Sequence, residues 1–172
     1  MAGKHAVFIV AQKNFRDEEY FEPKKILEAA GIAVSTASSY LTPATGKLGG
    51  TAEIDLLFTE IDASKFDIVI FVGGSGVVAY WDDWRAQSVA KLFLENNKPV
   101  AAICSAPVIL AKAGLLKGKR ATSFNGDSDK MRECGAVYSD KEVEIDGLII
   151  TANGPEAAKA FGRTIVEFLS AR

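Results

Sequence analysis

The chain has 172 residues, of which 48% are hydrophobic and 24% charged, and this balance predicts a single soluble domain over residues 1–172 rather than a disordered chain. The 20 basic and 22 acidic residues give a net charge of −2 and form no basic run, which argues against nucleic acid as a partner. No stretch reaches the roughly 18 uninterrupted apolar residues of a membrane span, and two cysteines are too few for a disulfide framework or a zinc site; we therefore expect a cytoplasmic protein without membrane contact.

The first half of the chain alternates short apolar runs with an amphipathic segment. Ala6–Val10 is apolar and predicts a buried strand; because charged residues rather than a cleavage site follow it, it is not interpreted as a signal peptide. Glu18–Ala30 has apolar residues at helical spacing and ends at Gly31, so it predicts a helix. Ile32–Ser38 predicts a second strand, and the glycine-rich stretch 40–61 predicts an irregular hairpin excursion.

The second half continues the same alternation. Asp67–Gly74 predicts a central strand that ends in glycines, and Pro99–Cys104 predicts another strand that runs directly into a helix. Glu142–Thr151 predicts a β-hairpin with Asp146-Gly147 as its turn. Helices are predicted over Trp84–Asn96, Ala106–Ala113, Asp129–Cys134 and Pro155–Ser170.

Continuous apolar strands separated by helices indicate a parallel sheet that is covered on both faces. We therefore predict an α/β fold: a three-layer α/β/α sandwich of flavodoxin-like type, with a mostly parallel central sheet and an added β-hairpin. In open sheets of this kind ligands bind beyond the carboxyl ends of the strands. The residues that directly follow the strands are therefore the candidates for chemistry.

One such segment is AAICSAP, from Ala101 to Pro107, in which a buried strand delivers Cys104 to a turn before a helix. The pattern is similar to the nucleophile elbow G-x-S-x-G, with cysteine in place of serine and alanines in place of glycines. Free N–H groups at a helix N-terminus stabilise a thiolate, so we expect a lowered pKa for this thiol. On the pattern alone, an unreactive buried cysteine is an equally good interpretation.

Two further segments lie at predicted strand ends. VGGSG, from Val72 to Gly76, either exposes backbone N–H groups to an oxyanion or is a plain tight turn. It matches neither the P-loop nor G-x-G-x-x-G, so nucleotide binding is rejected and no cofactor is expected. Glu18 and Glu19 begin the first predicted helix, where the macrodipole alone favours acidic residues. That explanation is still compatible with Glu18 or Glu19 pointing over the end of the sheet toward Cys104.

Together the segments NFRDEEYFEP, FVGGSG, AAICSAP, GKRATSF and VEIDGLIITANGPEAAKAFGRTIVEFL resemble the ThiJ/PfpI superfamily. This group has a class I glutamine amidotransferase-like fold and includes the parkinsonism-associated protein deglycase and archaeal intracellular proteases. The resemblance implies that Cys104 is the reactive cysteine and that the Glu19 carboxyl forms a hydrogen bond with its thiol. It also implies an oxyanion hole formed by Gly74 and the backbone N–H of Ser105, and a homodimer in which a second subunit can complete the site.

The chain departs from this superfamily at the positions that would carry a histidine. Peptidase-type members have histidine directly after the cysteine, where this chain has Ser105; other members have histidine or tyrosine where this chain has Phe124. The only histidine, His5, begins the first predicted strand and is expected at the opposite end of the sheet. A Cys-His dyad or triad is therefore not expected. The resemblance favours the Cys-Glu arrangement of the deglycase and redox-sensor branch.

A carboxyl that is partly desolvated at the sheet edge stays protonated and can donate a hydrogen bond to a thiolate. We therefore predict a cysteine-dependent stress-response protein acting on small reactive carbonyls or their protein adducts, as a glutathione-independent glyoxalase or deglycase of lyase or hydrolase type. Cys104 would be the nucleophile and Glu19 the acid/base. The alternative is a non-catalytic redox sensor or chaperone that acts through oxidation of Cys104. A PfpI-type cysteine peptidase is disfavoured because Ser105 stands where the histidine would be.

The remaining candidates are given structural roles. Cys134 ends a short predicted helix and is interpreted as an ordinary residue. Trp81–Trp84 is interpreted as a loop and helix cap, with its tryptophans as an alternative dimer contact or pocket rim. Asp127 and Asp129 are interpreted as turn and cap residues, and no metal site is expected because no other acidic or histidine cluster accompanies them.

Overall fold

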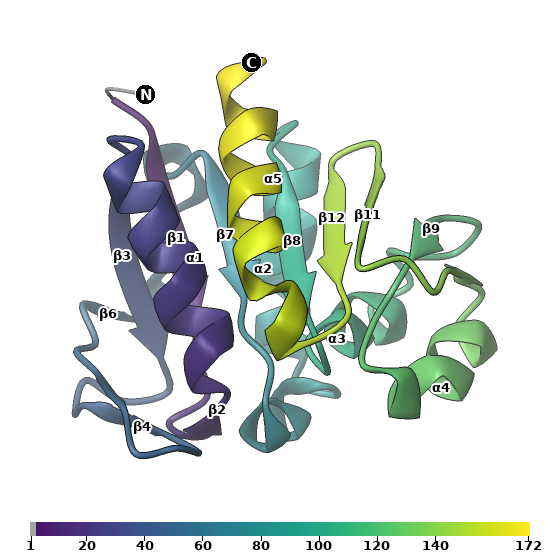
Figure 1. Ribbon diagram of the computed structural model, residues 1–172, viewed down its shortest axis with the longest axis horizontal. Helices are drawn as coiled ribbons and strands as arrows, with labels where there is room; N and C mark the ends of the chain where they lie inside the picture. Colours follow the sequence, from purple (N-terminus) through teal and green to yellow (C-terminus); the bar gives the residue numbers. More distant parts are fainter. Residues whose placement is uncertain (1–2) are drawn as a thin grey trace.

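A central sheet of seven strands runs in the order β11-β12-β8-β7-β1-β3-β6 in the computed structural model, which describes residues 3–172 (Figure 1). Neighbouring strands are parallel except in the pair β11–β12, which is antiparallel at one edge. The strands are β1 (His5–Ile9), β3 (Ala33–Ser38), β6 (Leu56–Leu57), β7 (Ile68–Phe71), β8 (Val100–Ile103), β11 (Val143–Asp146) and β12 (Ile149–Ala152).

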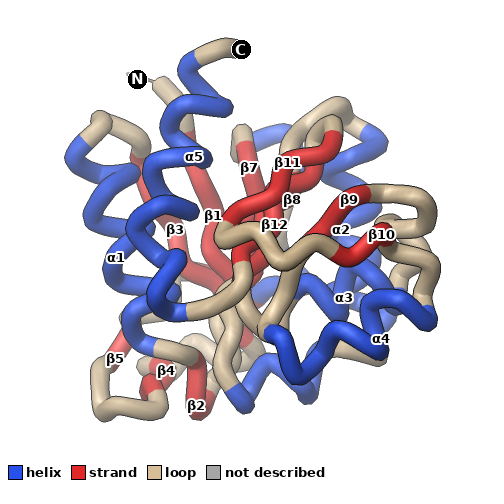
Figure 2. Tube along the Cα trace, turned by 45° about the vertical axis from the view of Figure 1, so that its right-hand side comes forward, coloured by secondary structure: helices blue, strands red, loops and turns tan. Residues whose placement is uncertain are grey.

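Helices cover both faces of this sheet. α1 (Asp17–Ala29) and α5 (Ala158–Ser170) lie together on one face, in front of the sheet in Figure 1, and α2 (Trp84–Glu95) and α3 (Pro107–Lys112) lie on the other. α4 (Ser128–Glu133) lies to one side, beyond β12 (Figure 2). The structure therefore confirms the predicted three-layer α/β/α sandwich with a mostly parallel sheet and an added hairpin.

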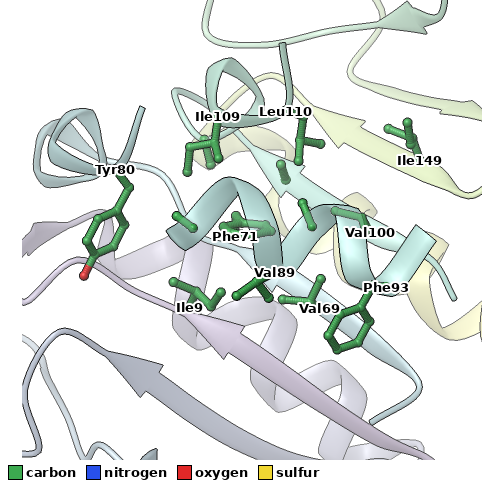
Figure 3. Packing of buried hydrophobic residues seen from close by; sticks show 14 of the residues in the cluster. Ile9, Val69, Phe71, Tyr80, Val89, Phe93, Val100, Ile109, Leu110 and Ile149 are labelled. Carbon is green, nitrogen blue, oxygen red and sulfur yellow. The ribbon is translucent and has the colours of Figure 1, made fainter. Parts of the chain in front are cut away.

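Alternate residues of each central strand enter opposite halves of the core, because successive side chains of a strand point to opposite faces. On β7, Val69 and Phe71 pack with Phe93 of α2 in the cluster of Figure 3. Ile70 instead packs with Phe161 of α5 in the second cluster. Both faces are apolar and buried, which is why these strands are apolar at consecutive positions.

Two details differ from the sequence-based prediction. Asp146 pairs with Ile149, so the two-residue turn of the hairpin is Gly147-Leu148, with Gly147 at φ +60°, and the prediction was one residue too early. The excursion 40–61 contains the expected small hairpin, but its end joins the main sheet as β6. The short strands are β2 (Lys13–Phe15), β4 (Ala44–Gly46), β5 (Thr51–Ala52), β9 (Arg120–Ala121) and β10 (Val137–Tyr138).

The ends of the sheet are chemically different. His5 begins β1, where its Nε2 lies 2.8 Å from Ser35 Oγ and its ring centroid lies 4.6 Å from that of Phe66. Cys104 follows the last residue of the parallel strand β8, so the histidine lies at the opposite edge, as predicted. No helix within residues 3–172 combines the length and the apolar character needed to cross a membrane.

Candidate active site

Cys104 stands at the carboxyl edge of the sheet, the lower edge in Figure 1, in a strained backbone conformation. Its φ is +64°, in the left-handed region that non-glycine residues rarely adopt. Two neighbouring segments hold it there: its N–H donates to Ala152 O at 2.9 Å, and its carbonyl oxygen accepts from the N–H of Phe124 at 2.7 Å. Such strain persists only where the surroundings enforce it and is concentrated at functional sites.

Glu19 lies in the first turn of α1 and is fully buried beside Cys104. Both groups crowd Gly73: a Cβ on that residue would lie 2.5 Å from Glu19 Oε1 and 2.7 Å from Cys104 Cβ. Neither carboxyl oxygen of Glu19 has a hydrogen-bond partner among residues 3–172. Burial raises the pKa of Glu19 to about 8, although the facing thiol, Arg16 and the Gly73 N–H oppose that rise.

The two acidic residues considered from the sequence have different environments. Arg16 donates from Nε and Nη2 to Glu18 Oε2, at 2.9 Å each, and this carboxylate raises the pKa of the guanidinium. Glu18 is therefore occupied by an ion pair and is partly exposed, whereas Glu19 faces the sulfur. The structure thus brings the second glutamate, and not the first, to Cys104.

The Cys104 thiol has the opposite pKa shift from the one expected from the sequence. Burial, together with the negative charge of the adjacent Glu19 carboxyl, raises its pKa to about 12, and the N–H groups of Ser105 and Gly74 lower it only in part. The expected lowering was wrong because α3 is a short helix beginning only at Pro107, whereas a buried carboxylate directly faces the sulfur. The carboxyl therefore loses its proton before the thiol does, and the two groups titrate as a coupled pair.

The N–H groups of Gly74 and Ser105 both face the Cys104 sulfur. Gly74 has φ +106°, and a Cβ there would lie 2.5 Å from both Arg16 N and Asn14 O, so only glycine fits this close approach. A carbonyl carbon attached to the sulfur would place its oxygen near these donors. The four site residues predicted from the sequence therefore lie together: they are Glu19, Gly74, Cys104 and Ser105.

A cavity of about 750 Å³ opens above the thiol, which is within the usual range for small-molecule sites. Its wall contains residues from six separate parts of the chain. These are Arg16, Glu19, Lys47, Gly74, Ser75, Cys104, Ser105, Phe124, Asn125, Asn153, Pro155 and Glu156. The sequence analysis did not single out the charged and amide residues among them, apart from Glu19, although Arg16, Asn153 and Glu156 lie in the segments that carry the resemblance.

Lys47 reaches the cavity through a contact of the β4–β5 hairpin with α1. Asp17 is buried, and its carboxylate accepts hydrogen bonds from the N–H groups of Leu48 and Gly50, at 2.8 Å each. Two hydrogen bonds to Asp17 thus hold the predicted hairpin excursion, residues 40–61, against the start of α1. The excursion contributes Lys47 to the wall of the cavity.

Phe124 lines the cavity at the position where the resembled superfamily can have histidine or tyrosine, and its side chain supplies no acid or base. Asp127, interpreted from the sequence as a cap, is at the N-cap position of α4 but makes no capping hydrogen bond. Instead its Oδ2 accepts from Ser105 Oγ at 2.7 Å. Asp83, by contrast, caps α2 by accepting from Arg85 N, so the cap lies within Trp81–Trp84 as expected. Within residues 3–172, no three His, Cys, Asp or Glu side chains are grouped to hold a metal ion.

Comparisons with known proteins place these features in context. The model of the DJ-1/PfpI family matches residues 4–168. The putative cysteine protease YraA of Bacillus subtilis is 36% identical over 170 residues, covering 98% of this chain and 99% of the relative. A deglycase of Pyrococcus abyssi is 35% identical over 163 residues, covering 95% and 98%. The crystal structure of a ThiJ/PfpI domain protein from Brachyspira murdochii has a TM-score of 0.97 and 45% identity, covering 99% of each chain.

Proposed function

Because the chain belongs to the DJ-1/PfpI family, we propose that it is a cysteine-dependent stress-response enzyme of the deglycase type. Its substrates would be small reactive carbonyls or their adducts on proteins. The observation that carries this proposal is the pairing of Cys104 with the fully buried Glu19 carboxyl. An acid with a pKa of about 8 can both accept and return a proton near neutral pH.

The first chemical step follows from this pairing. The Glu19 carboxylate takes the thiol proton while the Cys104 sulfur forms a bond to the aldehyde carbon, and the carbonyl oxygen becomes negatively charged. The N–H groups of Gly74 and Ser105 stabilise that charge, and Glu19 then returns the proton to the oxygen. The product is a hemithioacetal. A base is needed because the raised pKa of the thiol leaves little free thiolate.

The same carboxyl can serve the later steps. In an α-oxoaldehyde, one proton moves from the sulfur-bearing carbon to the neighbouring carbon, and the hydroxyl proton moves to the neighbouring carbonyl oxygen, which yields a thioester of a hydroxy acid. Water then releases the hydroxy acid and restores the thiol. The cavity of about 750 Å³ exceeds the needs of a three-carbon aldehyde, which supports adducts on amines or thiols as substrates too. Arg16 and Lys47 at its wall are suited to polar or anionic parts of such molecules.

Lactate formation tests this proposal. The protein is incubated with methylglyoxal in the absence of glutathione, and D- and L-lactate are measured. We expect product from the wild type and from the control variant Cys134→Ser, none from Cys104→Ser, and about 10²- to 10⁴-fold less from Glu19→Gln. Lactate formation that is independent of Cys104, or absent from the wild type, would refute the proposed Cys104-dependent activity.

A redox role of Cys104 is the second candidate, and the facing N–H groups of Gly74 and Ser105 favour it because they could bind the oxygens of a sulfinate. Mass spectrometry after mild peroxide treatment should then find Cys104 modified before Cys134. Equal or reversed modification counts against a sensor. The raised pKa of the Cys104 thiol makes catalysis with a base the better-supported role, because oxidation proceeds through the thiolate.

Peptide cleavage is the least supported activity, although one relative is called a putative cysteine protease. Neither Ser105 nor Phe124 supplies an imidazole beside Cys104, and His5 lies at the other sheet edge. Casein turnover that is lost in Cys104→Ala would restore this possibility. The homodimer implied by the family is also a proposal, which the molar mass in solution tests.

A further inference from the structure

Ser105 is held from three directions. Its hydroxyl donates to Asp127 Oδ2 at 2.7 Å, and its carbonyl oxygen accepts from Trp81 Nε1 at 2.8 Å. Its own N–H faces the Cys104 sulfur. The Ser105 N–H lies in the peptide group shared with Cys104, whose carbonyl oxygen accepts from Phe124 N–H at 2.7 Å. The bonds of the Ser105 side chain and carbonyl hold the residue on the other side of its Cα, so they restrict the rotation that would turn this N–H away from the sulfur.

Both partners contact α4, although they come from distant parts of the chain. Asp127 precedes this helix, is only 9% exposed, and is held by its own N–H, which donates to Phe124 O at 2.9 Å. Lys130 lies on the helix itself, with its Nζ 5.5 Å from the centroid of the Trp81 ring. Asp127, at the start of α4, and Trp81 therefore hold Ser105 from two sides.

The direction of the hydroxyl proton matters for the chemistry. A carboxylate can only accept, so the Ser105 proton points at Asp127 and is not available to the Cys104 sulfur. Ser105 thus cannot replace the missing histidine as a side-chain donor. The contribution of this residue to the site is its backbone N–H.

We propose that Asp127 is a positioning residue: by binding the Ser105 hydroxyl, it directs the Ser105 N–H at the Cys104 sulfur and at the oxyanion formed there. This role explains why the carboxylate of Asp127 is buried although it does not cap α4. The kinetic part of this proposal rests on the proposed function, whereas its effect on the thiol itself does not.

The test compares Asp127→Ala, Asp127→Asn and Ser105→Ala on a Cys134→Ser background, with Asp129→Ala as the matched control. Asp129 lies in the same turn, but its side chain is 91% exposed and pairs with Arg132 at 3.6 Å. The first readout is the pH dependence of Cys104 alkylation by iodoacetamide. The second is the separate kcat and KM for lactate formation from methylglyoxal.

We expect Asp127→Ala to slow alkylation at a fixed mildly alkaline pH by about threefold to tenfold, the effect of weakening one hydrogen bond to the sulfur, with the inflection displaced to higher pH. Ser105→Ala should have the same effect, and the double variant no larger one, because both break the same bond. Asp127→Asn should retain most of the wild-type rate, since its amide oxygen still accepts. In the kinetics, kcat falls and KM changes little.

Wild-type alkylation and kcat in Asp127→Ala would overturn the proposal, as would additive effects of Asp127→Ala and Ser105→Ala. If Asp127→Ala does not fold, Ser105→Ala and Trp81→Phe decide in its place, because each removes one of the two bonds that hold Ser105. If the wild type makes no lactate, the proposed function fails while the alkylation profile still decides this inference. Lactate formation with unaffected alkylation refutes this inference alone.

Discussion

Replacing Glu19 with glutamine changes how the stability of the fold depends on pH. The carboxyl is fully buried, and burial raises its pKa from 4.5 to about 8. An acid whose pKa is higher in the folded chain binds more protons there than in the unfolded chain. The contribution of this group to the free energy of unfolding is therefore fully favourable below its pKa in the unfolded chain. It is lost as the pH rises through its pKa in the folded chain.

The size of this loss follows from the two pKa values. From pH 4.5 to neutral pH, the folded chain keeps the Glu19 proton that the unfolded chain has released. At about 1.4 kcal/mol for each pH unit, the free energy of unfolding falls by about 3 kcal/mol over that interval. Glutamine is neutral throughout, so the advantage of Glu19→Gln over the wild type should grow by the same amount. Below pH 8 the Cys104 thiol is protonated in both states and adds nothing to the difference.

Urea unfolding of both proteins at fixed protein concentration, from about pH 5 to about pH 8, measures this difference. Glu18→Gln is the matched control, because Glu18 is partly exposed and paired with Arg16; its difference from the wild type should not grow in this way. A difference between Glu19→Gln and the wild type that stays constant with pH would refute the buried, raised-pKa carboxyl on which the site is built.

Three other substitutions test the surroundings of the pair. Gly73→Ala should destabilise the fold by about 1–3 kcal/mol in urea unfolding, because the new Cβ meets Glu19 Oε1 at 2.5 Å and the backbone oxygen of Ile103 at 2.6 Å; wild-type stability would contradict this close packing. Asp17→Ala should expose the Lys47 peptide bond to trypsin, because it frees two N–H groups of the β4–β5 turn; an unchanged digestion pattern would contradict that contact. Phe161→Ala should cost about 3–5 kcal/mol of stability in the core without moving the pH profile of thiol alkylation, and a moved profile would show coupling that the packing does not explain.

The sheet and its two covering layers could be predicted from the sequence because the strands are buried on both faces. Ile68–Phe71 and Val100–Ile103 are apolar at every position, and each ends at the residues that carry the site. The exact strands of the predicted hairpin excursion 40–61 could not be predicted, and neither could β2 or the pairing of β6 with the main sheet, since two or three residues show no periodicity. Their pairing depends on tertiary contacts such as those of Asp17.

The candidate site was predictable only in part, for a related reason. Cys104 directly follows β8, and Gly74 lies three residues after the end of β7, so their shared location follows from the parallel sheet. Glu19 could be separated from Glu18 only through the family resemblance, and Asp127 was interpreted as a cap because nothing local indicates a bond to Ser105. The pKa of the thiol was predicted in the wrong direction because a sequence does not show how deeply the facing carboxyl is buried.

The pH profile of Cys104 alkylation, compared between wild type and Glu19→Gln on a Cys134→Ser background, tests the paired thiol and carboxyl most directly. With Glu19 as the base, the wild-type rate should rise with an inflection near pH 8, the pKa of the carboxyl. In Glu19→Gln that inflection should disappear, and the rate should rise only at more alkaline pH, where the buried thiol ionises by itself. The same inflection in both proteins would show that Cys104 reacts without Glu19, and would contradict the pair.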